Sequence, residues 1–158
     1  MPNDLLQEAE QIGFESLFNC KTLACSQAVL LAVQSTFGPK DPLLIKAVSP
    51  MAGGSRVGSL CGALQGGILS LGMHYGTTEE KMNNKEALMA SYEPVMRLYR
   101  SFESAFGSRY CPQIIQADLA DEEQRKKWLD KGGWKKCALL CGQTARMVGE
   151  ILMEHNKL

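Results

Sequence analysis

The stretch Ser59-Leu60-Cys61-Gly62-Ala63-Leu64-Gln65-Gly66-Gly67 opens a helix that the sequence predicts over residues 60–73, with Ser59 as its N-cap. Gly72 follows in the same helix, so glycine occupies four of its positions. Each glycine costs a helix interior roughly 1 kcal/mol relative to alanine. Close approach is the physical benefit that offsets this cost, so we expect another helix, a ligand or a metal cluster to lie against this face.

Outside this stretch the periodicity of apolar residues is also helical, and no alternating pattern longer than a few residues predicts a strand. Pro94 predicts a kink or a division in one long helix. The further helices are expected over residues 3–19, 24–37, 43–51 (one or two turns), 78–106, from 111 onward, 121–132 and 134–154. The sequence therefore predicts an all-α fold: a single-domain helical bundle of about five to seven helices that spans residues 1–158.

Composition excludes several classes of function. The chain of 158 residues carries 17 basic and 17 acidic residues, so no electrostatic footprint indicates a nucleic acid or an anionic membrane as partner. No apolar run approaches the roughly 20 residues that a membrane-spanning helix needs. The start of the chain has no basic segment followed by an apolar core, so we expect no export signal and a cytoplasmic protein.

Six cysteines in a chain without an export signal argue against a disulfide framework. In a reducing compartment such cysteines are metal ligands, redox-active thiols or small buried hydrophobic residues. His74 and His155 are the two histidines, so a zinc site of two cysteines and two histidines is weakly supported. The spacing typical of covalent haem attachment is absent.

Cys61 is the strongest candidate for a reactive thiol. It lies in the first turn of the predicted glycine-rich helix, where free backbone N–H groups and the helix dipole favour a thiolate. Arg56 is near in sequence and is expected to add positive potential. The alternative is a buried cysteine in a tight helix crossing, with the glycines present only for packing.

Two other cysteines also lie near predicted helix starts. Cys111 precedes Pro112, a residue favoured in the first turn, so the same argument predicts a lowered pKa for the Cys111 thiol. Cys25 lies just inside the start of an amphipathic helix, and the pattern alone fits a core position as well as a ligand. We therefore treat Cys61 and Cys111 as the candidate catalytic thiols.

Cys137 and Cys141 are four residues apart, so they share one face of the last predicted helix. This spacing can place both sulfurs on one metal, or one of them against a thiol from another segment. It does not favour a disulfide between the two, because residues on successive helical turns give poor disulfide dihedrals. Cys20 lies alone at a helix junction and is interpreted as a packing residue.

The order of these elements resembles the redox-active family labelled C_GCAxxG_C_C. Where the label has Gly-Cys-Ala, this chain has Cys61-Gly62-Ala63, and the resemblance extends from about Ala9 to Leu152. The matching elements, in order, are Cys25-Ser26-Gln27-Ala28-Val29-Leu30, Gly53-Gly54-Ser55-Arg56, Cys61-Gly62-Ala63-Leu64-Gln65-Gly66, Phe106-Gly107 with Cys111, and Lys136-Cys137.

The resemblance implies a small helical domain with a redox role. A similar domain occurs in split-Soret cytochrome c, where a cysteine-bound iron centre accompanies the haems. Carried over to this chain, the metal or cofactor ligands would be Cys25, Cys61, Cys111 and Cys137. This sequence departs from the pattern by adding Cys20 and Cys141, and Cys141 is an alternative to Cys137 as the fourth ligand.

Four hypotheses follow. The favoured one is a redox protein whose four cysteines bind an iron–sulfur cluster for electron transfer or redox sensing. The second is a metal-free thiol–disulfide oxidoreductase, in which Cys61 attacks and Cys111 or Cys25 resolves. The third is a structural zinc-binding module, and the fourth is a helical domain with buried cysteines. A redox partner protein of unknown identity and a homodimer are expected as well.

Overall fold

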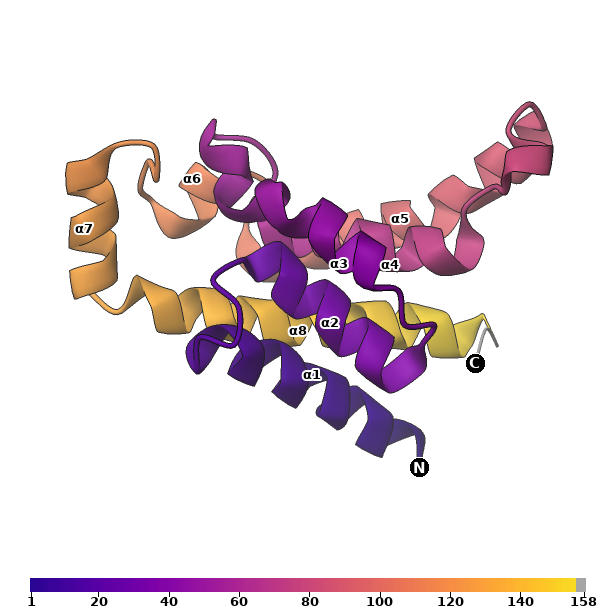
Figure 1. Cartoon of the computed structure of the whole chain (residues 1–158), viewed down its shortest axis with the longest axis horizontal. Helices are drawn as coiled ribbons and strands as arrows, with labels where there is room; N and C mark the ends of the chain where they lie inside the picture. The colour runs from indigo at the N-terminus through magenta and orange to yellow at the C-terminus, as the bar shows by residue number, and fades with distance from the viewer. Residues whose placement is uncertain (156–158) are drawn as a thin grey trace.

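The computed structural model describes residues 1–155, and within that range the fold contains eight α-helices, two short 3-10 helices and no β-strand (Figure 1). The elements are α1 (Pro2–Phe18), α2 (Cys25–Phe37), α3 (Pro42–Val48), η1 (Ser49–Arg56), α4 (Gly62–Tyr75), η2 (Glu79–Lys81), α5 (Lys85–Phe106), α6 (Cys111–Ile115), α7 (Glu122–Asp130) and α8 (Gly133–Glu154). The all-α prediction is confirmed. The predicted number of five to seven helices is slightly low for this range. The short helices α3 and α6, each with a proline in the first turn, are separate elements as the sequence predicts.

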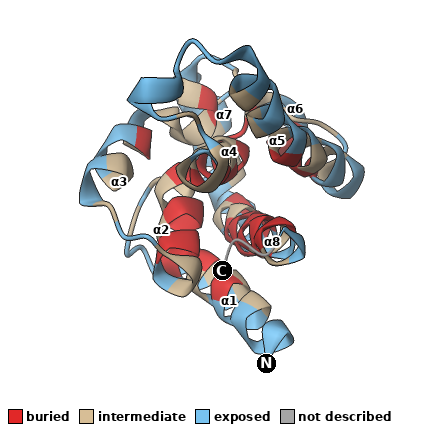
Figure 2. Ribbon diagram, turned by 90° about the vertical axis from the view of Figure 1, so that its right-hand side faces the viewer, coloured by how far each residue is buried: buried red, intermediate tan, exposed pale blue. Residues whose placement is uncertain are grey.

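The core lies where α1, α2, α4 and α8 meet. Helix α8 packs along α1 and also contacts α2, α4 and α5. The buried faces of α2, α4 and α8 turn toward one another in Figure 2. Apolar side chains from all of these helices, such as Leu17, Val29, Leu64, Phe102 and Leu152, are almost fully buried there.

Small residues let the helices approach closely, as the glycine-rich sequence predicts. A Cβ atom at Gly66 would lie 2.4 Å from the carbonyl oxygen of Ser26, at the crossing of α4 and α2. A Cβ atom at Gly142 would lie 2.6 Å from the carbonyl oxygen of Glu10, at the crossing of α8 and α1. These distances leave no room for alanine without separation of the backbones.

The glycine-rich helix begins two residues later than the sequence predicts. Cys61 is the N-cap of α4, and the predicted N-cap Ser59 is part of an extended segment instead. That segment pairs with the residues before α6: the Cys61 N–H donates to the carbonyl of Arg109 at 2.8 Å, and the Cys111 N–H donates to the carbonyl of Ser59 at 3.0 Å. This backbone pairing outweighs the capping preference of Ser59, and it brings the starts of α4 and α6 side by side.

Helix α5 also differs from its predicted start. The segment at 78–81 is only a short 3-10 helix, and α5 begins at Lys85, where the Asn84 side chain accepts a hydrogen bond from the Ala87 N–H. Pro94 lies inside α5 without dividing it. The first half of α5 extends away from the helical body in Figure 1. None of the described helices is both long and apolar enough to cross a membrane.

Candidate functional site

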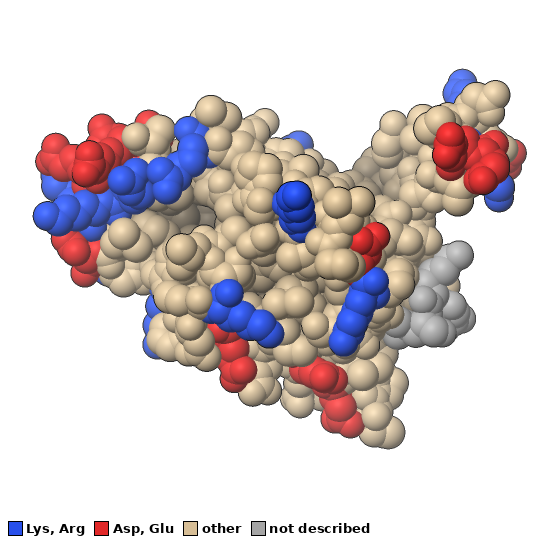
Figure 3. Space-filling model, viewed as in Figure 1, with Lys and Arg blue, Asp and Glu red and all other residues tan. Residues whose placement is uncertain are grey.

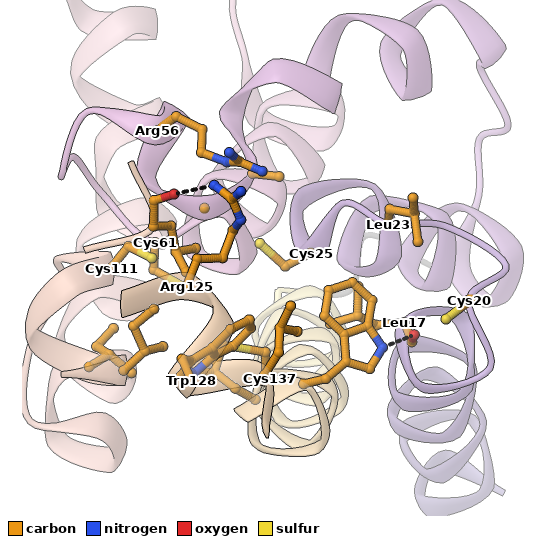
Figure 4. A pocket seen from close by; sticks show the side chains of 18 residues that line it. Leu17, Cys20, Leu23, Cys25, Arg56, Cys61, Cys111, Arg125, Trp128 and Cys137 are labelled. Carbon is orange, nitrogen blue, oxygen red and sulfur yellow. Dashed lines mark hydrogen bonds between the residues drawn. The ribbon is translucent and has the colours of Figure 1, made fainter. Parts of the chain in front are cut away.

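Five of the six cysteines line one cavity of about 560 Å³. They come from separate segments of the chain. In Figure 4, Cys25, Cys61, Cys111 and Cys137 surround the space between α2, α4, α6 and α8, and Cys20 lies further out. The five are Cys20, Cys25, Cys61, Cys111 and Cys137. The tertiary structure therefore gathers all four thiols that the family resemblance singles out.

Three of these thiols lie at helix starts. Cys25 is the first residue of α2, Cys61 is the N-cap of α4, and Cys111 is the first residue of α6. Cys137 lies near the start of α8, on the fourth side of the cavity. All six cysteines are free thiols in the structure.

Two glycines make room for the cysteine side chains. A Cβ atom at Gly62 would lie 2.5 Å from the Sγ atom of Cys25. A Cβ atom at Gly54 would lie 2.9 Å from the Cβ atom of Cys111, and Gly54 has a φ of +63°, which favours glycine. Glycine at these two positions is therefore required by the placement of the thiols and not only by helix packing.

Backbone N–H groups act on two of the cavity thiols. Burial raises the pKa of the Cys25 thiol, and the backbone at Gly53, Ser26 and Ala63 offsets part of that rise. The backbone at Ala63 and Leu64, in the first turn of α4, opposes the larger effect of burial on the pKa of Cys61 in the same way. The start of α4 thus directs its free N–H groups at sulfur, as expected from the position of Cys61.

Burial nevertheless outweighs these hydrogen bonds, because an apolar cavity disfavours the charged thiolate. Burial raises the pKa of Cys61 well above the usual value for a thiol, and the charges of Cys25 and Cys111 raise it further. Burial and the charge of Cys25 raise the pKa of the Cys111 thiol to about 12. Burial and the charge of Cys25 are also the main causes that raise the pKa of the Cys137 thiol to about 12. The prediction that helix starts lower the pKa of Cys61 and Cys111 is therefore wrong for the protein without a bound cation.

Cys137 and Cys141 lie in different surroundings. Cys137 lines the cavity, whereas Cys141 is fully buried among the helices and donates its S–H to the carbonyl of Cys25 at a sulfur–oxygen distance of 3.6 Å. Cys20, interpreted from sequence as a packing residue, is exposed at the edge of the cavity. Only the tertiary structure separates these positions.

No local pattern in the sequence predicts that α7 contributes to this site. Arg125, Trp128 and Leu129 of α7 line the cavity with Trp134 of α8. The two tryptophan rings pack edge to face with centroids 6.5 Å apart, and Trp134 Nε1 donates to the carbonyl of Leu17 at 2.8 Å. The two tryptophans, six residues apart, are the sequence feature that could have indicated this wall of the cavity. Their spacing alone does not show which cavity they line.

The thiols are arranged around the cavity rather than about a single point. Within residues 1–155, no group of three or more Cys, His, Asp and Glu side chains is arranged to hold a metal ion. One zinc ion with four thiolates at about 2.3 Å would bring the sulfurs within roughly 4 Å of one another. The absence of a preformed single-ion site among residues 1–155 applies to zinc and to iron alike.

Comparisons with known proteins agree with the motif order. The family model described as "Putative redox-active protein (C_GCAxxG_C_C)" matches residues 23–151. An uncharacterised protein of Archaeoglobus fulgidus is 27% identical over 129 residues, which cover 78% of this chain and 85% of that protein. No solved structure matches the chain significantly.

Proposed function

The chain belongs to the C_GCAxxG_C_C family, whose members are described as redox-active, and we propose that Cys25, Cys61, Cys111 and Cys137 form its redox centre by binding an iron–sulfur cluster. The observation that carries this proposal is the convergence of these four thiols, from four separate elements, on one cavity. Thiolates are the ligands that iron–sulfur clusters require, and a bound cluster would supply one-electron transfer. The role in the cell would then be electron transfer or redox sensing.

The surroundings of the thiols support this proposal. Backbone N–H groups that donate to cysteine sulfur tune the reduction potential of a cluster, and backbone groups beside Cys25 and Cys61 lower the pKa of both thiols against the effect of burial. The thiols also raise one another's pKa, a repulsion that a bound cation would relieve. In a four-iron cluster each thiolate binds a different iron, so such thiolates lie further apart than those around a single zinc ion.

A metal-free thiol–disulfide exchange is the second candidate, supported by the central place of Cys25. The charge of Cys25 raises the pKa of Cys61, Cys111, Cys137 and Cys141, so it lies near all of them. A disulfide between Cys25 and one neighbour would release two electrons and two protons to an oxidant. The raised thiol pKa values disfavour exchange, which needs a thiolate at neutral pH, whereas a bound cation would itself displace the protons of its thiol ligands.

Anaerobic purification followed by a visible spectrum and by iron, zinc and labile sulfide analysis tests the proposal. We expect a coloured protein that contains iron and sulfide, and we expect Cys61→Ser to lose most of both because one ligand is removed. Cys20→Ser is the matched control, since Cys20 lies at the edge of the cavity and outside the proposed ligand set. The iron and sulfide contents of Cys137→Ser and Cys141→Ser identify the fourth ligand. We expect Cys137→Ser to lose most of both and Cys141→Ser to keep them.

The alternatives give different results in that experiment. A colourless protein with stoichiometric zinc would support the structural zinc-binding module. A colourless, metal-free protein that loses two thiols on mild oxidation would support thiol–disulfide exchange. Full iron content in Cys61→Ser would remove Cys61 from the site.

We also propose that the chain forms a homodimer through the exposed half of α5. Leu88, Met89, Tyr92 and Met96 share one face of this helix, and between 39% and 55% of each is exposed. Contiguous exposed apolar side chains indicate an interaction surface. Gly62, Gly66 and Gly67 of the glycine-rich helix α4, by contrast, pack against neighbouring segments of the same chain.

Light scattering with size-exclusion chromatography tests the dimer. We expect a mass of twice the 17.4 kDa of the chain, and we expect Tyr92→Glu to yield the monomer because it places a charge at the centre of the apolar face. Ala90→Glu places the same charge at an exposed position on the other side of the same helix, and this control should remain dimeric. A wild-type mass of one chain would contradict the proposal.

A further inference from the structure

Two arginines face each other at one end of the cysteine cavity. Arg56 comes from η1 and Arg125 from α7, and both line the cavity. Figure 4 shows their guanidinium groups pointing toward one another. Arg56 is exposed and Arg125 is half-buried, so water screens part of their mutual repulsion, and an anion between them would relieve the rest.

Neither arginine has an acidic partner among the residues that the structure describes. Arg125 donates one hydrogen bond, from Nη1 to the carbonyl of Leu119 at 3.2 Å, which leaves most of its five donors available. Arg97, Arg109 and Arg146, by contrast, all form ion pairs with glutamates. Figure 3 shows a row of basic side chains over α7 with acidic side chains beside it. Lys127 forms an ion pair with Glu123 there, and Arg125 forms none with the described residues.

The backbone that carries Arg56 is strained. Gly53, Gly54, Ser55 and Arg56 follow one another with φ between +56° and +63°, a left-handed turn in which the last two residues are not glycine. Side chains disfavour this conformation, and such strain persists where the surrounding structure holds it, often at ligand sites. The turn holds Gly53 and Arg56 at the cavity together.

The remainder of the cavity wall is mainly apolar. Leu23, Leu119, Trp128, Leu129 and Trp134 line it beside the cysteines. A volume of about 560 Å³ lies within the range of small-molecule sites, which combine apolar walls with a few polar groups that fix orientation. A ligand that matches this cavity has an anionic head and an apolar body.

We propose that this cavity binds a small organic anion, with its charged oxygens between Arg56 and Arg125 and its apolar body against the walls. Guanidinium groups present a planar fork of donors that suits the oxygens of carboxylates and phosphates. The bound molecule would lie beside the thiols of the cavity. This inference goes beyond the proposed redox role, because anion binding requires neither a cluster nor a disulfide.

Fluorescence titration of the anaerobically purified protein tests the proposal with 8-anilinonaphthalene-1-sulfonate, an aromatic anion. We expect saturable binding that weakens about tenfold in Arg56→Gln and in Arg125→Gln, because each removes a charged hydrogen-bonding partner. Arg100→Gln, an exposed arginine outside the cavity, is the matched control and should bind as the wild type does. Arg56→Gly is a second variant that relieves the strained φ, so loss of binding in it cannot be attributed to misfolding.

The neutral analogue N-phenyl-1-naphthylamine separates charge recognition from apolar binding. We expect its affinity to be equal in the wild type and in both glutamine variants, and we expect binding of the anion alone to weaken with salt. Displacement by 1-naphthoate or by 1-naphthyl phosphate then shows whether the head group is a carboxylate or a phosphate. Unchanged anion affinity in both arginine variants, or failure of both competitors to displace the probe, would overturn the proposal.

Discussion

Gly66→Ala is expected to lower the free energy of unfolding by about 3 kcal/mol, the upper part of the usual range for overpacking. The new Cβ atom would lie 2.4 Å from the carbonyl oxygen of Ser26 and 3.2 Å from its Cα atom, and both are backbone atoms that cannot rotate away. Ser26 is fully buried, and its hydroxyl donates to the carbonyl of Val48 at 2.8 Å, which holds this part of α2 in place. Helices α2 and α4 would have to separate.

Gly72→Ala in the same helix is the matched control. No atom lies within 4 Å of a Cβ atom built at Gly72, so only helix propensity changes there, and we expect the free energy of unfolding to rise by about 1 kcal/mol. Urea unfolding followed by circular dichroism measures both variants. Equal stability of the two would show that α2 and α4 are not in the close contact described here.

The second large effect concerns thiol chemistry in the reduced, metal-free protein. Cys111 and Cys137, with thiol pKa values of about 12 instead of 9, should hold about a thousandfold less thiolate at neutral pH than an ordinary cysteine. Alkylation by iodoacetamide should therefore be slow at both positions and should rise about tenfold per pH unit. Peptide mass spectrometry at intervals from pH 7 to pH 10 measures the rates.

Cys20 is the internal reference for that experiment, because it is exposed at the edge of the same cavity. We expect its alkylation to be complete before Cys111 or Cys137 reacts. Labelling of all three at one rate at neutral pH would show that the cavity does not desolvate its thiols. A bound cluster would protect the ligand thiols in addition, so the metal must be removed first.

The same shifts predict how stability depends on pH. The folded state keeps the protons of Cys111 and Cys137 up to about pH 12, whereas the unfolded chain loses them near pH 9. The unfolded state therefore binds fewer protons in this window, and the free energy of unfolding of the metal-free protein should fall as the pH rises from 9 to 12. The contribution is fully present below pH 9.

Local patterns in the sequence were sufficient to predict much of this protein. The helical periodicity predicts the all-α fold, because a helix with one apolar face has no alternative to burying it. Glycine at positions 62 and 66 predicts close approach, and the structure places the Cys25 sulfur against Gly62 and the backbone of Ser26 against Gly66. The order of Cys25, Cys61 and Cys111 along the chain indicates the family.

Other features depend on contacts between distant segments. Pairing of the residues around Leu60 with those around Tyr110 moved the start of α4 to Gly62, although Ser59 has the better capping side chain. Burial reversed the expected direction of the pKa shift at Cys61, since desolvation depends on every neighbour of a sulfur and not on its helix alone.

Residues close together in the chain predict the helices, a close approach at the glycines and the set of candidate cysteines. Contacts between distant segments place Cys137 and not Cys141 at the cavity, and they bring Arg125 to Arg56 there. The reason is that a cavity forms where helices far apart in sequence pack together. Which side chains enter it depends on the relative rotation and position of those helices, and no local pattern records either.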